Sequence, residues 1–217
     1  MNSTRTRILI VDDHPLICEG LTMRLSLQPD LQVCGEAATE EEALTLVYKT
    51  APNLVLVDIS LKCGHGIELV KQIKSRHPRV KMLVVSGFDE SLYAEWALRA
   101  GALGYLNKQE SNEKLLDAIR TVLAGKRFVS ATIAQRLVGQ ALGHAHQANT
   151  PIDRLSDREL QIFHLIGKGL TTGAIADQLF ISTHTIDTHR ENIKHKLGIP
   201  NAGELTRAAV QWVLESS

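Results

Sequence analysis

Four short apolar runs, each ending in a charged or hydroxyl-bearing residue, constrain the fold of this chain more than any other feature. ILIVDD ends at Asp12 and Asp13, NLVLVD at Asp58, KMLVVS at Ser86 and GYLNK at Lys108. Runs of β-branched and aliphatic residues of this length predict buried strands. Because the carboxyl ends of parallel strands meet at one edge of an open sheet, we expect these side chains to gather in one crevice there.

The residue types in that crevice predict its chemistry. Three crowded carboxylates repel one another and favour a hard divalent cation with oxygen ligands, so Asp12, Asp13 and Asp58 predict a Mg²⁺ site. The Lys108 ammonium and the Ser86 hydroxyl would face an anion that joins the metal, which indicates the handling of a phosphoryl group. Aspartate is also frequent in ordinary turns, but three at matching strand ends favour the functional interpretation. We further expect the Asp58 carboxylate to be open to solvent.

Apolar runs alternate with helical periods through the first 125 residues. Strands are predicted at Arg7–Asp12, Gln32–Ala37, Asn53–Asp58, Lys81–Ser86 and Gly104–Asn107, and helices at Pro15–Leu25, Glu40–Lys49, Gly66–Arg76, Ser91–Ala100 and Asn112–Ala124. Parallel neighbours in a sheet need crossover helices between them. The series therefore predicts an α/β fold, a doubly wound five-stranded parallel sheet.

The composition excludes several classes of protein. The chain has 217 residues, of which 44% are hydrophobic and 22% charged, so it is neither disordered nor a coiled coil. Three cysteines without a spaced framework, and the lack of an apolar signal or membrane-spanning stretch, predict a soluble cytoplasmic protein without membrane contact. A net charge of +0 gives no hint of nucleic acid, so any prediction of DNA binding must come from local pattern.

The second half of the chain has a different pattern. The stretch 126–150 holds a weak helical segment and ends in GHAHQANT, directly before Pro151, which is typical of a linker. From Ile152 onward no strand pattern appears: Ser156 and Glu159 form a predicted capping box, and four helices follow. The short second helix and the longer third, Thr183–Leu197, predict an all-α helix-turn-helix domain. The predicted divisions are 1–125, a linker at 126–150, and 151–217.

Both halves resemble a known family. The first resembles the flavodoxin-like receiver domain of two-component response regulators, because the acidic pair, Asp58, the Ser86-Gly87 pair and Lys108 fall in that family's order. The second resembles the LuxR/NarL-type output domain, because this chain closely follows the pattern of that domain in the stretch LSDRELQIFHLIGKGLTTGAIADQLFISTHTIDTHRENIKHKLGI. The resemblance covers nearly the whole chain.

The resemblance implies a role for each residue of the first site. Asp58 would be the phosphoacceptor, binding Mg²⁺ together with Asp12 and Asp13, and Lys108 would hold the phosphoryl oxygens. It also implies a sensor histidine kinase as phosphoryl donor, dimerisation on phosphorylation and slow hydrolysis of the phosphate, with no other enzymatic activity.

The resemblance also implies a switch beside the phosphoacceptor. Ser86 would donate a hydrogen bond to the phosphoryl oxygens and move inward when they arrive. Gly87 would leave the phosphate accessible, and Tyr105 would turn inward as the hydroxyl moves. Phosphorylation adds negative charge at one site, and this charge can shift the equilibrium of an element that has two arrangements. The element implied here is the face around the fourth helix and the fifth strand.

In the output domain the resemblance implies binding of double-stranded promoter DNA by the third helix. The implied contacts are Thr183, Thr185, Asp187, Thr188, His189, Arg190, Glu191, Lys194 and Lys196. Asp187 stands where the family often has lysine, and its carboxylate could accept from a cytosine amino group. Other departures are Lys62, where many members have proline, and Ala174, where an acidic residue is usual.

Two other functions remain open from the sequence. An aspartyl-phosphate hydrolase of the haloacid-dehalogenase type would need a second aspartate two residues after the nucleophile, where this chain has Ser60. The third function is that of a DNA-binding or adaptor protein that works without phosphorylation. A receiver that lacked its aspartates would favour this function, but all five site residues, Asp12, Asp13, Asp58, Ser86 and Lys108, are present.

Overall fold

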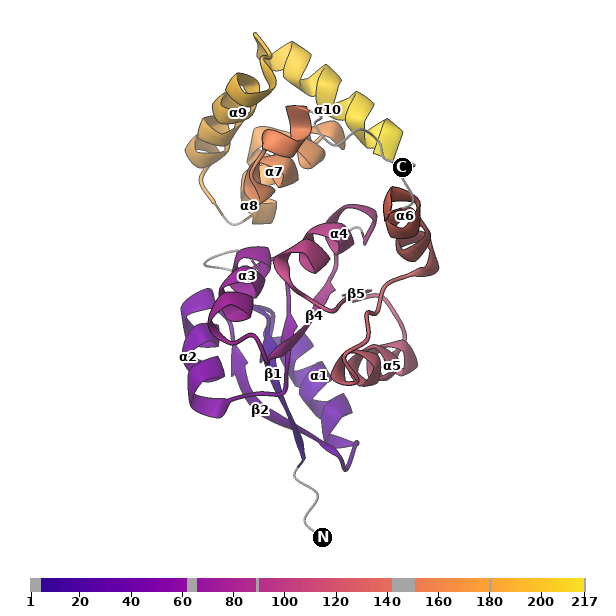
Figure 1. Cartoon of the computed structure of the whole chain (residues 1–217). Coiled ribbons are helices and arrows are strands. Elements are labelled where there is room, and N and C mark those ends of the chain that lie inside the picture. Colours follow the sequence, from indigo (N-terminus) through magenta and orange to yellow (C-terminus); the bar gives the residue numbers. More distant parts are fainter. Residues whose placement is uncertain (1–4, 62–65, 89, 142–150, 180, 217) are drawn as a thin grey trace. The chain divides into compact units, whose positions relative to one another are not determined.

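The computed structural model describes residues 5–61, 66–88, 90–141, 151–179 and 181–216 (Figure 1). The chain forms two compact units, Met1–Gln135 and Arg136–Ser217, and each is described by itself. Within the described ranges, no helix combines the length and the apolar character needed to cross a membrane. Lys62, one of the departures noted above, lies outside the described residues.

The first unit is built on a parallel sheet. Its strands are β1 (Thr6–Val11), β2 (Leu31–Ala37), β3 (Leu54–Val57), β4 (Lys81–Ser86) and β5 (Gly104–Asn107), in the order β2-β1-β3-β4-β5. Every neighbouring pair is parallel, and Val57 lies opposite both Val11 and Val84. The predicted doubly wound sheet is confirmed, with each strand boundary within one residue of the prediction.

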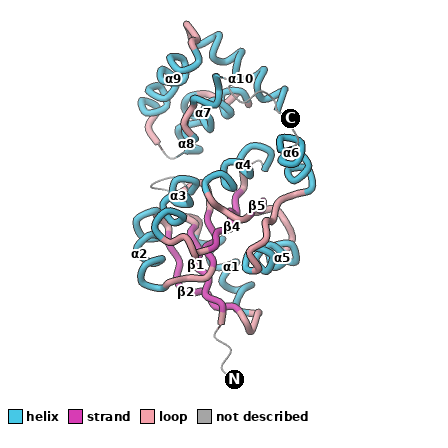
Figure 2. Tube along the Cα trace, in the orientation of Figure 1, coloured by secondary structure: helices cyan, strands magenta, loops and turns pink. Residues whose placement is uncertain are grey.

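Helices cover both faces of this sheet (Figures 1 and 2). They are α1 (Pro15–Ser26), α2 (Glu40–Thr50), α3 (Gly66–Arg76), α4 (Glu90–Ala100) and α5 (Asn112–Leu123). The faces of α1 and α5 pack on alternate strand residues such as Ile8, Ile10 and Leu56, all at most 1% exposed. Both faces of the central strands are therefore buried, which explains why they are continuous apolar runs in the sequence.

The predicted linker begins as part of the first unit. Phe128 forms a bridge with Gly104, and its carbonyl oxygen accepts from the Tyr105 N–H at 2.9 Å. Helix α6 (Ala131–Ala141) follows, capped by Ser130, whose own N–H donates to the Glu90 carboxylate at 2.9 Å. The stretch 126–135 thus belongs to the first unit, and residues 142–150 lie outside the described part.

The second unit contains only helices in its described part. After a short 3-10 turn at Pro151–Arg154 come α7 (Asp157–Gly167), α8 (Thr172–Leu179), α9 (Thr183–Leu197) and α10 (Ala202–Ser216). The predicted capping box is present, with the Glu159 N–H donating to Ser156 Oγ and the Ser156 N–H donating to Glu159 Oε2 at 2.7 Å. A shared core of residues such as Phe163, Ile175 and Ile186, each fully buried, holds the four helices together.

Candidate functional site

Three aspartates lie side by side where β1 and β3 end. Asp12 and Asp58 directly follow these strands, and the N–H of Asp58 donates to the Val11 carbonyl at 2.8 Å, which aligns the two chains where they leave the sheet. One ligand atom from each of Asp12, Asp13, His14 and Asp58 lies within 4.8 Å of the others. The structure therefore brings together the carboxylates that lie far apart in the sequence.

Lys108 joins two of these carboxylates. It follows β5, and its N–H donates to the Ser86 carbonyl at 2.9 Å, which fixes its backbone beside β4. Its Nζ lies 2.7 Å from Asp12 Oδ2 and 2.7 Å from Asp58 Oδ2. The side chain is only 16% exposed, so this bridge is shielded from solvent and stronger than a surface ion pair.

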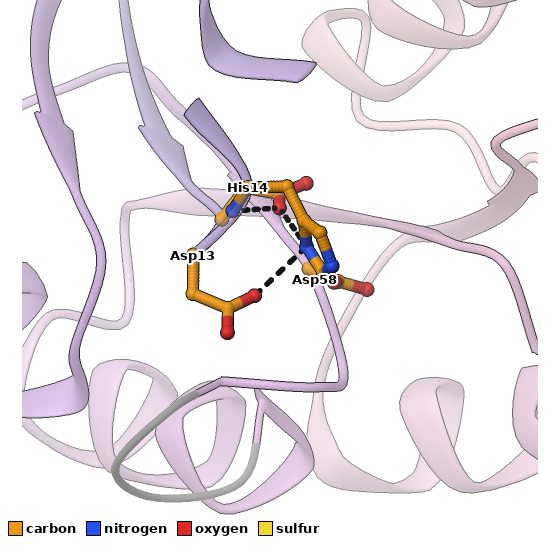
Figure 3. Close-up of side chains that lie close together, drawn as sticks. Asp13, His14 and Asp58 are labelled. Atoms are coloured by element: carbon orange, nitrogen blue, oxygen red, sulfur yellow. Dashed lines mark hydrogen bonds and ion pairs between the residues drawn. The ribbon is translucent and has the colours of Figure 1, made fainter. Parts of the chain in front are cut away.

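His14 is a member of the cluster that sequence reasoning left without a role. Its Nδ1 lies 3.0 Å from Asp12 Oδ1 and 2.9 Å from Asp13 Oδ1, so the ring contacts both members of the acidic pair. Figure 3 shows His14 beside Asp13 and Asp58. About half of the imidazole is exposed, and it forms the solvent side of the site. The only sign in the sequence that His14 belongs to the cluster was its position directly after the acidic pair. A lone histidine at the start of a helix has many other uses, so this position did not single it out.

Burial and charge act against each other in this cluster. Burial raises the pKa of Asp58 above its ordinary value, and the nearby Asp12 carboxylate adds to that effect, while Lys108 partly opposes it. For Lys108, burial would lower the pKa, but the carboxylates of Asp58 and Asp12 outweigh it and raise the pKa. The ammonium is therefore charged at neutral pH and stabilises the ionised carboxylates.

The donor set fits a small hard cation. Carboxylate oxygens are the preferred ligands of Mg²⁺, and at bond lengths of about 2.1 Å opposite ligands in an octahedron lie about 4.2 Å apart. The spread of 4.8 Å among the ligand atoms is close to that value, so small shifts of Asp12, Asp13 and Asp58 suffice to hold the ion. The half-exposed face at His14 leaves room for the water ligands that Mg²⁺ usually keeps.

Our expectation that Asp58 is open to solvent is wrong. The residue is only 3% exposed. One carboxylate oxygen accepts from the Ile59 N–H at 2.8 Å, and the other is covered by the Lys108 ammonium. The expectation missed this because the Lys108 side chain, which comes from the end of a distant strand, covers the carboxylate.

The residues predicted to form the switch lie next to this cluster. Ser86 is fully buried at the end of β4, whereas Gly87 is exposed and a Cβ there would meet nothing within 4 Å. The Tyr105 ring is buried, and its hydroxyl donates to the Phe88 carbonyl at 2.9 Å. Burial raises the pKa of Tyr105 far above its usual range, so the hydroxyl stays protonated and remains a donor.

In the second unit, α8 and α9 form the predicted helix-turn-helix. Ser182 caps α9 by accepting from the Thr185 N–H at 3.0 Å, and Gly198 ends the helix in the left-handed conformation. Ile186 and Ile193 point into the core. Of the predicted DNA contacts, Thr183, Asp187, Thr188 and Glu191 are exposed, and Thr185, His189, Arg190, Lys194 and Lys196 are partly buried.

Two of the predicted contacts have internal roles. Lys196 Nζ lies 2.6 Å from Glu159 Oε2, so its charge is paired with a nearly buried carboxylate on α7. His189 lies against the same region, and burial, with the positive charge of Arg158 as a second cause, lowers its pKa. A neutral, partly buried imidazole indicates that His189 packs inside the unit, and the contact of Lys196 with DNA stays a prediction.

Replacing Lys196 by methionine is expected to lower the free energy of unfolding by about 1–3 kcal/mol, because Glu159 would lose its charged partner. Burial alone would raise the Glu159 pKa, but hydrogen bonds from Lys196 and the Ser156 backbone lower it. A carboxyl group with a lowered pKa stabilises the fold above its ordinary pKa and loses that effect as the pH falls. Denaturant unfolding at pH 7 and pH 3.5 should therefore show a smaller deficit at the lower pH, and an equal deficit at both would contradict this role.

The two units together define a class: a parallel α/β domain with an acidic pocket at its strand ends, combined with a helix-turn-helix domain. The family model described as "Response regulator receiver domain" matches residues 8–120, and that described as "Bacterial regulatory proteins, luxR family" matches residues 153–209. This chain is thus a two-component response regulator, a member of the receiver family with a LuxR-type DNA-binding domain that regulates transcription.

Several known proteins are similar over most of the chain. The oxygen regulatory protein NreC of Staphylococcus aureus is 37% identical over 210 residues, covering 94% of this chain and 97% of NreC. A LuxR-family response regulator from Aurantimonas sp. SI85-9A1 is 34% identical with a TM-score of 0.59, covering 64% of this chain and 99% of that one. RcsB of Salmonella enterica serovar Typhimurium, solved bound to promoter rprA in the presence of phosphomimetic BeF3-, has a TM-score of 0.61 at 23% identity, covering 94% of this chain and 98% of RcsB.

Proposed function

We propose that Asp58 accepts a phosphoryl group from a sensor histidine kinase and that this modification controls binding of promoter DNA. The observation that carries the proposal is the Lys108 bridge, in which one ammonium lies 2.7 Å from the carboxylates of both Asp12 and Asp58 at the sheet edge. A buried cation beside a candidate nucleophile is placed to meet the oxygens of an incoming phosphoryl group.

The side chains can share the transfer step. A carboxylate oxygen of Asp58 forms the new bond to phosphorus, and the bond from phosphorus to the donor breaks, with its electron pair leaving on the donor. Lys108 releases Asp58 Oδ2 and follows the phosphoryl oxygens, while the Ile59 N–H keeps the other oxygen oriented. Mg²⁺ held by Asp12, Asp13 and Asp58 would supply positive charge that offsets the charge on the transferring group.

Transmission begins at Ser86. Its buried hydroxyl lies at the end of β4, from which it would move to the phosphoryl oxygens. Tyr105 already occupies an inward position and donates to Phe88, so the ring lies where the family resemblance expects it after phosphorylation. Both residues adjoin α4 and β5, the face that we propose for dimerisation.

The same proposal covers the remaining features of the protein. Residues 1–125 act as receiver and 151–217 bind DNA, with the stretch 126–150 between them, in a cytoplasmic protein that forms a homodimer when phosphorylated. RcsB has been solved as two dimers bound to two parallel DNAs, which supports this assembly in a protein of the same fold. Ser60, in place of a second aspartate after Asp58, limits phosphate chemistry to self-modification and slow hydrolysis.

A direct test is to incubate the full chain with acetyl phosphate and Mg²⁺ and to measure both intact mass and DNA affinity. We expect one phosphate-sized adduct and at least a tenfold gain in affinity for a promoter fragment, since a shift of about 1.4 kcal/mol is well within the coupling energies of two-state switches. An adduct without any change in affinity would leave phosphorylation intact but overturn its control of DNA binding.

A further inference from the structure

We propose that α9 selects operator half-sites through two carboxylates, Asp187 and Glu191, which read cytosine amino groups in the major groove. This inference rests on the proposed function, since it assumes that α9 enters DNA, and it adds the chemistry of the bases that are bound. The prediction from sequence paired Asp187 alone with cytosine. The side-chain positions give a different picture of the helix surface.

The outer face of α9 is defined by its exposed residues. These residues are Thr183, His184, Asp187, Thr188, Glu191, Asn192 and His195. The opposite face buries Ile186 and Ile193 in the core of the second unit, so the exposed set is the side of α9 that can meet a partner. Within α9, all of whose residues are described, this outer face carries two carboxylates and no lysine or arginine.

None of the lysines and arginines of α9 is among its exposed residues. Lys196 pairs with Glu159 on α7 at 2.6 Å, and Arg190 Nη1 lies 3.5 Å from Thr172 Oγ1 on α8. Lys194, whose side chain is 18% exposed, lies 2.9 Å from Glu191 Oε1. That contact orients the Glu191 carboxylate, which is still 72% exposed, and leaves its second oxygen to an outside donor.

Carboxylates accept hydrogen bonds and cannot donate them, which restricts the bases they can meet. In the major groove guanine presents two acceptors and thymine presents an acceptor and a methyl group, so a carboxylate is repelled by the first and gains little from the second. Adenine offers one donor beside an acceptor. Cytosine offers its N4 amino donor without an adjacent acceptor of its own, and it is the base that aspartate and glutamate contact.

The spacing of the two carboxylates matches neighbouring bases. Asp187 and Glu191 are one helical turn apart, a rise of about 6 Å along α9. Successive bases on one strand are about 3.4 Å apart. The pair therefore reaches two cytosines one or two steps apart on the same strand of each half-site.

The test is selection of binding sites from a random duplex library by the full chain after treatment with acetyl phosphate and Mg²⁺. The wild type should enrich two cytosines one or two steps apart in each half-site. Because asparagine and glutamine pair with adenine, Asp187→Asn should change one of these positions to adenine and Glu191→Gln the other. Replacing either cytosine in the selected site should weaken wild-type binding on the order of tenfold.

Asp177→Asn is the matched control, because Asp177 is an exposed aspartate on α8 and not on α9. It should leave the selected bases unchanged. Enriched sites without the cytosine pair, or identical base preferences in wild type, Asp187→Asn and Glu191→Gln, would overturn the inference while leaving phosphorylation-controlled DNA binding in place. Failure of the wild type to enrich any sequence, with or without acetyl phosphate, would overturn both.

Discussion

Replacement of Asp58 by asparagine is expected to abolish the phosphate adduct completely and, with it, any gain in DNA affinity on treatment with acetyl phosphate and Mg²⁺. An amide is not the nucleophile that a carboxylate is, and no other described carboxylate combines a position at the carboxyl end of β3 with the Lys108 contact at 2.7 Å. Intact mass measurement and a DNA titration of the same samples give the result.

The fold should survive this change. Burial raises the pKa of Asp58, which means that its charged form is disfavoured inside the protein, and asparagine removes that charge while Lys108 keeps Asp12 as a partner. We expect unfolding at a denaturant concentration no lower than that of the wild type. Asp30→Asn is the control, because Asp30 is a half-exposed aspartate paired with Arg120 in the same unit, and it should leave the adduct intact. An adduct that persists in Asp58→Asn would place the acceptor elsewhere in the cluster.

The sheet and the positions of the acidic residues were predictable because they follow from local pattern. Buried parallel strands are short, continuous apolar runs, and the polar residue that ends each run must lie at the carboxyl edge. Once the sheet was assigned, the meeting of Asp12, Asp58 and Lys108 followed from topology. The structure places all three there, and the lysine ammonium lies within hydrogen-bond distance of a carboxylate oxygen of each aspartate.

The missed features depend on contacts between distant side chains. The pairing of Lys196 with Glu159 joins residues 37 positions apart, and nothing in a basic helical pattern shows which lysine turns inward. Phe128 beside Gly104 was missed for a similar reason, since a single bridge has no periodicity. The covering of Asp58 depends on the direction of one side chain, which backbone topology leaves open.

The two units therefore differ in how charge is used. In the receiver, a buried lysine compensates the carboxylates of Asp12 and Asp58. In the DNA-binding unit, Lys194 and Lys196 of α9 each pair with a glutamate, and the exposed residues of α9 include two carboxylates but no lysine or arginine. Under the proposed function, we therefore expect affinity for DNA to depend on specific base contacts and on a second subunit more than on general attraction to phosphate.

Replacement of Lys108 by methionine is expected to give the largest loss of stability among these changes. Methionine keeps most of the stem but removes the ammonium, which leaves the carboxylates of Asp12 and Asp58 buried without their shared partner. Breaking a buried ion pair in this way costs on the order of 3 kcal/mol. The raised pKa of Lys108 means that its contribution is fully present at neutral pH and is lost only in strong alkali, so the deficit should appear at pH 7.

Mg²⁺ separates this explanation from a simple packing defect. If the deficit comes from uncompensated carboxylates, a divalent cation that binds them should restore part of the stability of Lys108→Met, and denaturant unfolding in a Mg²⁺ titration should show a larger gain for the variant than for the wild type. Lys114→Met is the control, because Lys114 pairs with Glu110 where both side chains are well exposed, and its loss should cost less than about 1 kcal/mol with no Mg²⁺ dependence. Equal stability of Lys108→Met and wild type, or a deficit that Mg²⁺ leaves untouched, would mean that Lys108 does not carry the charge balance of the site.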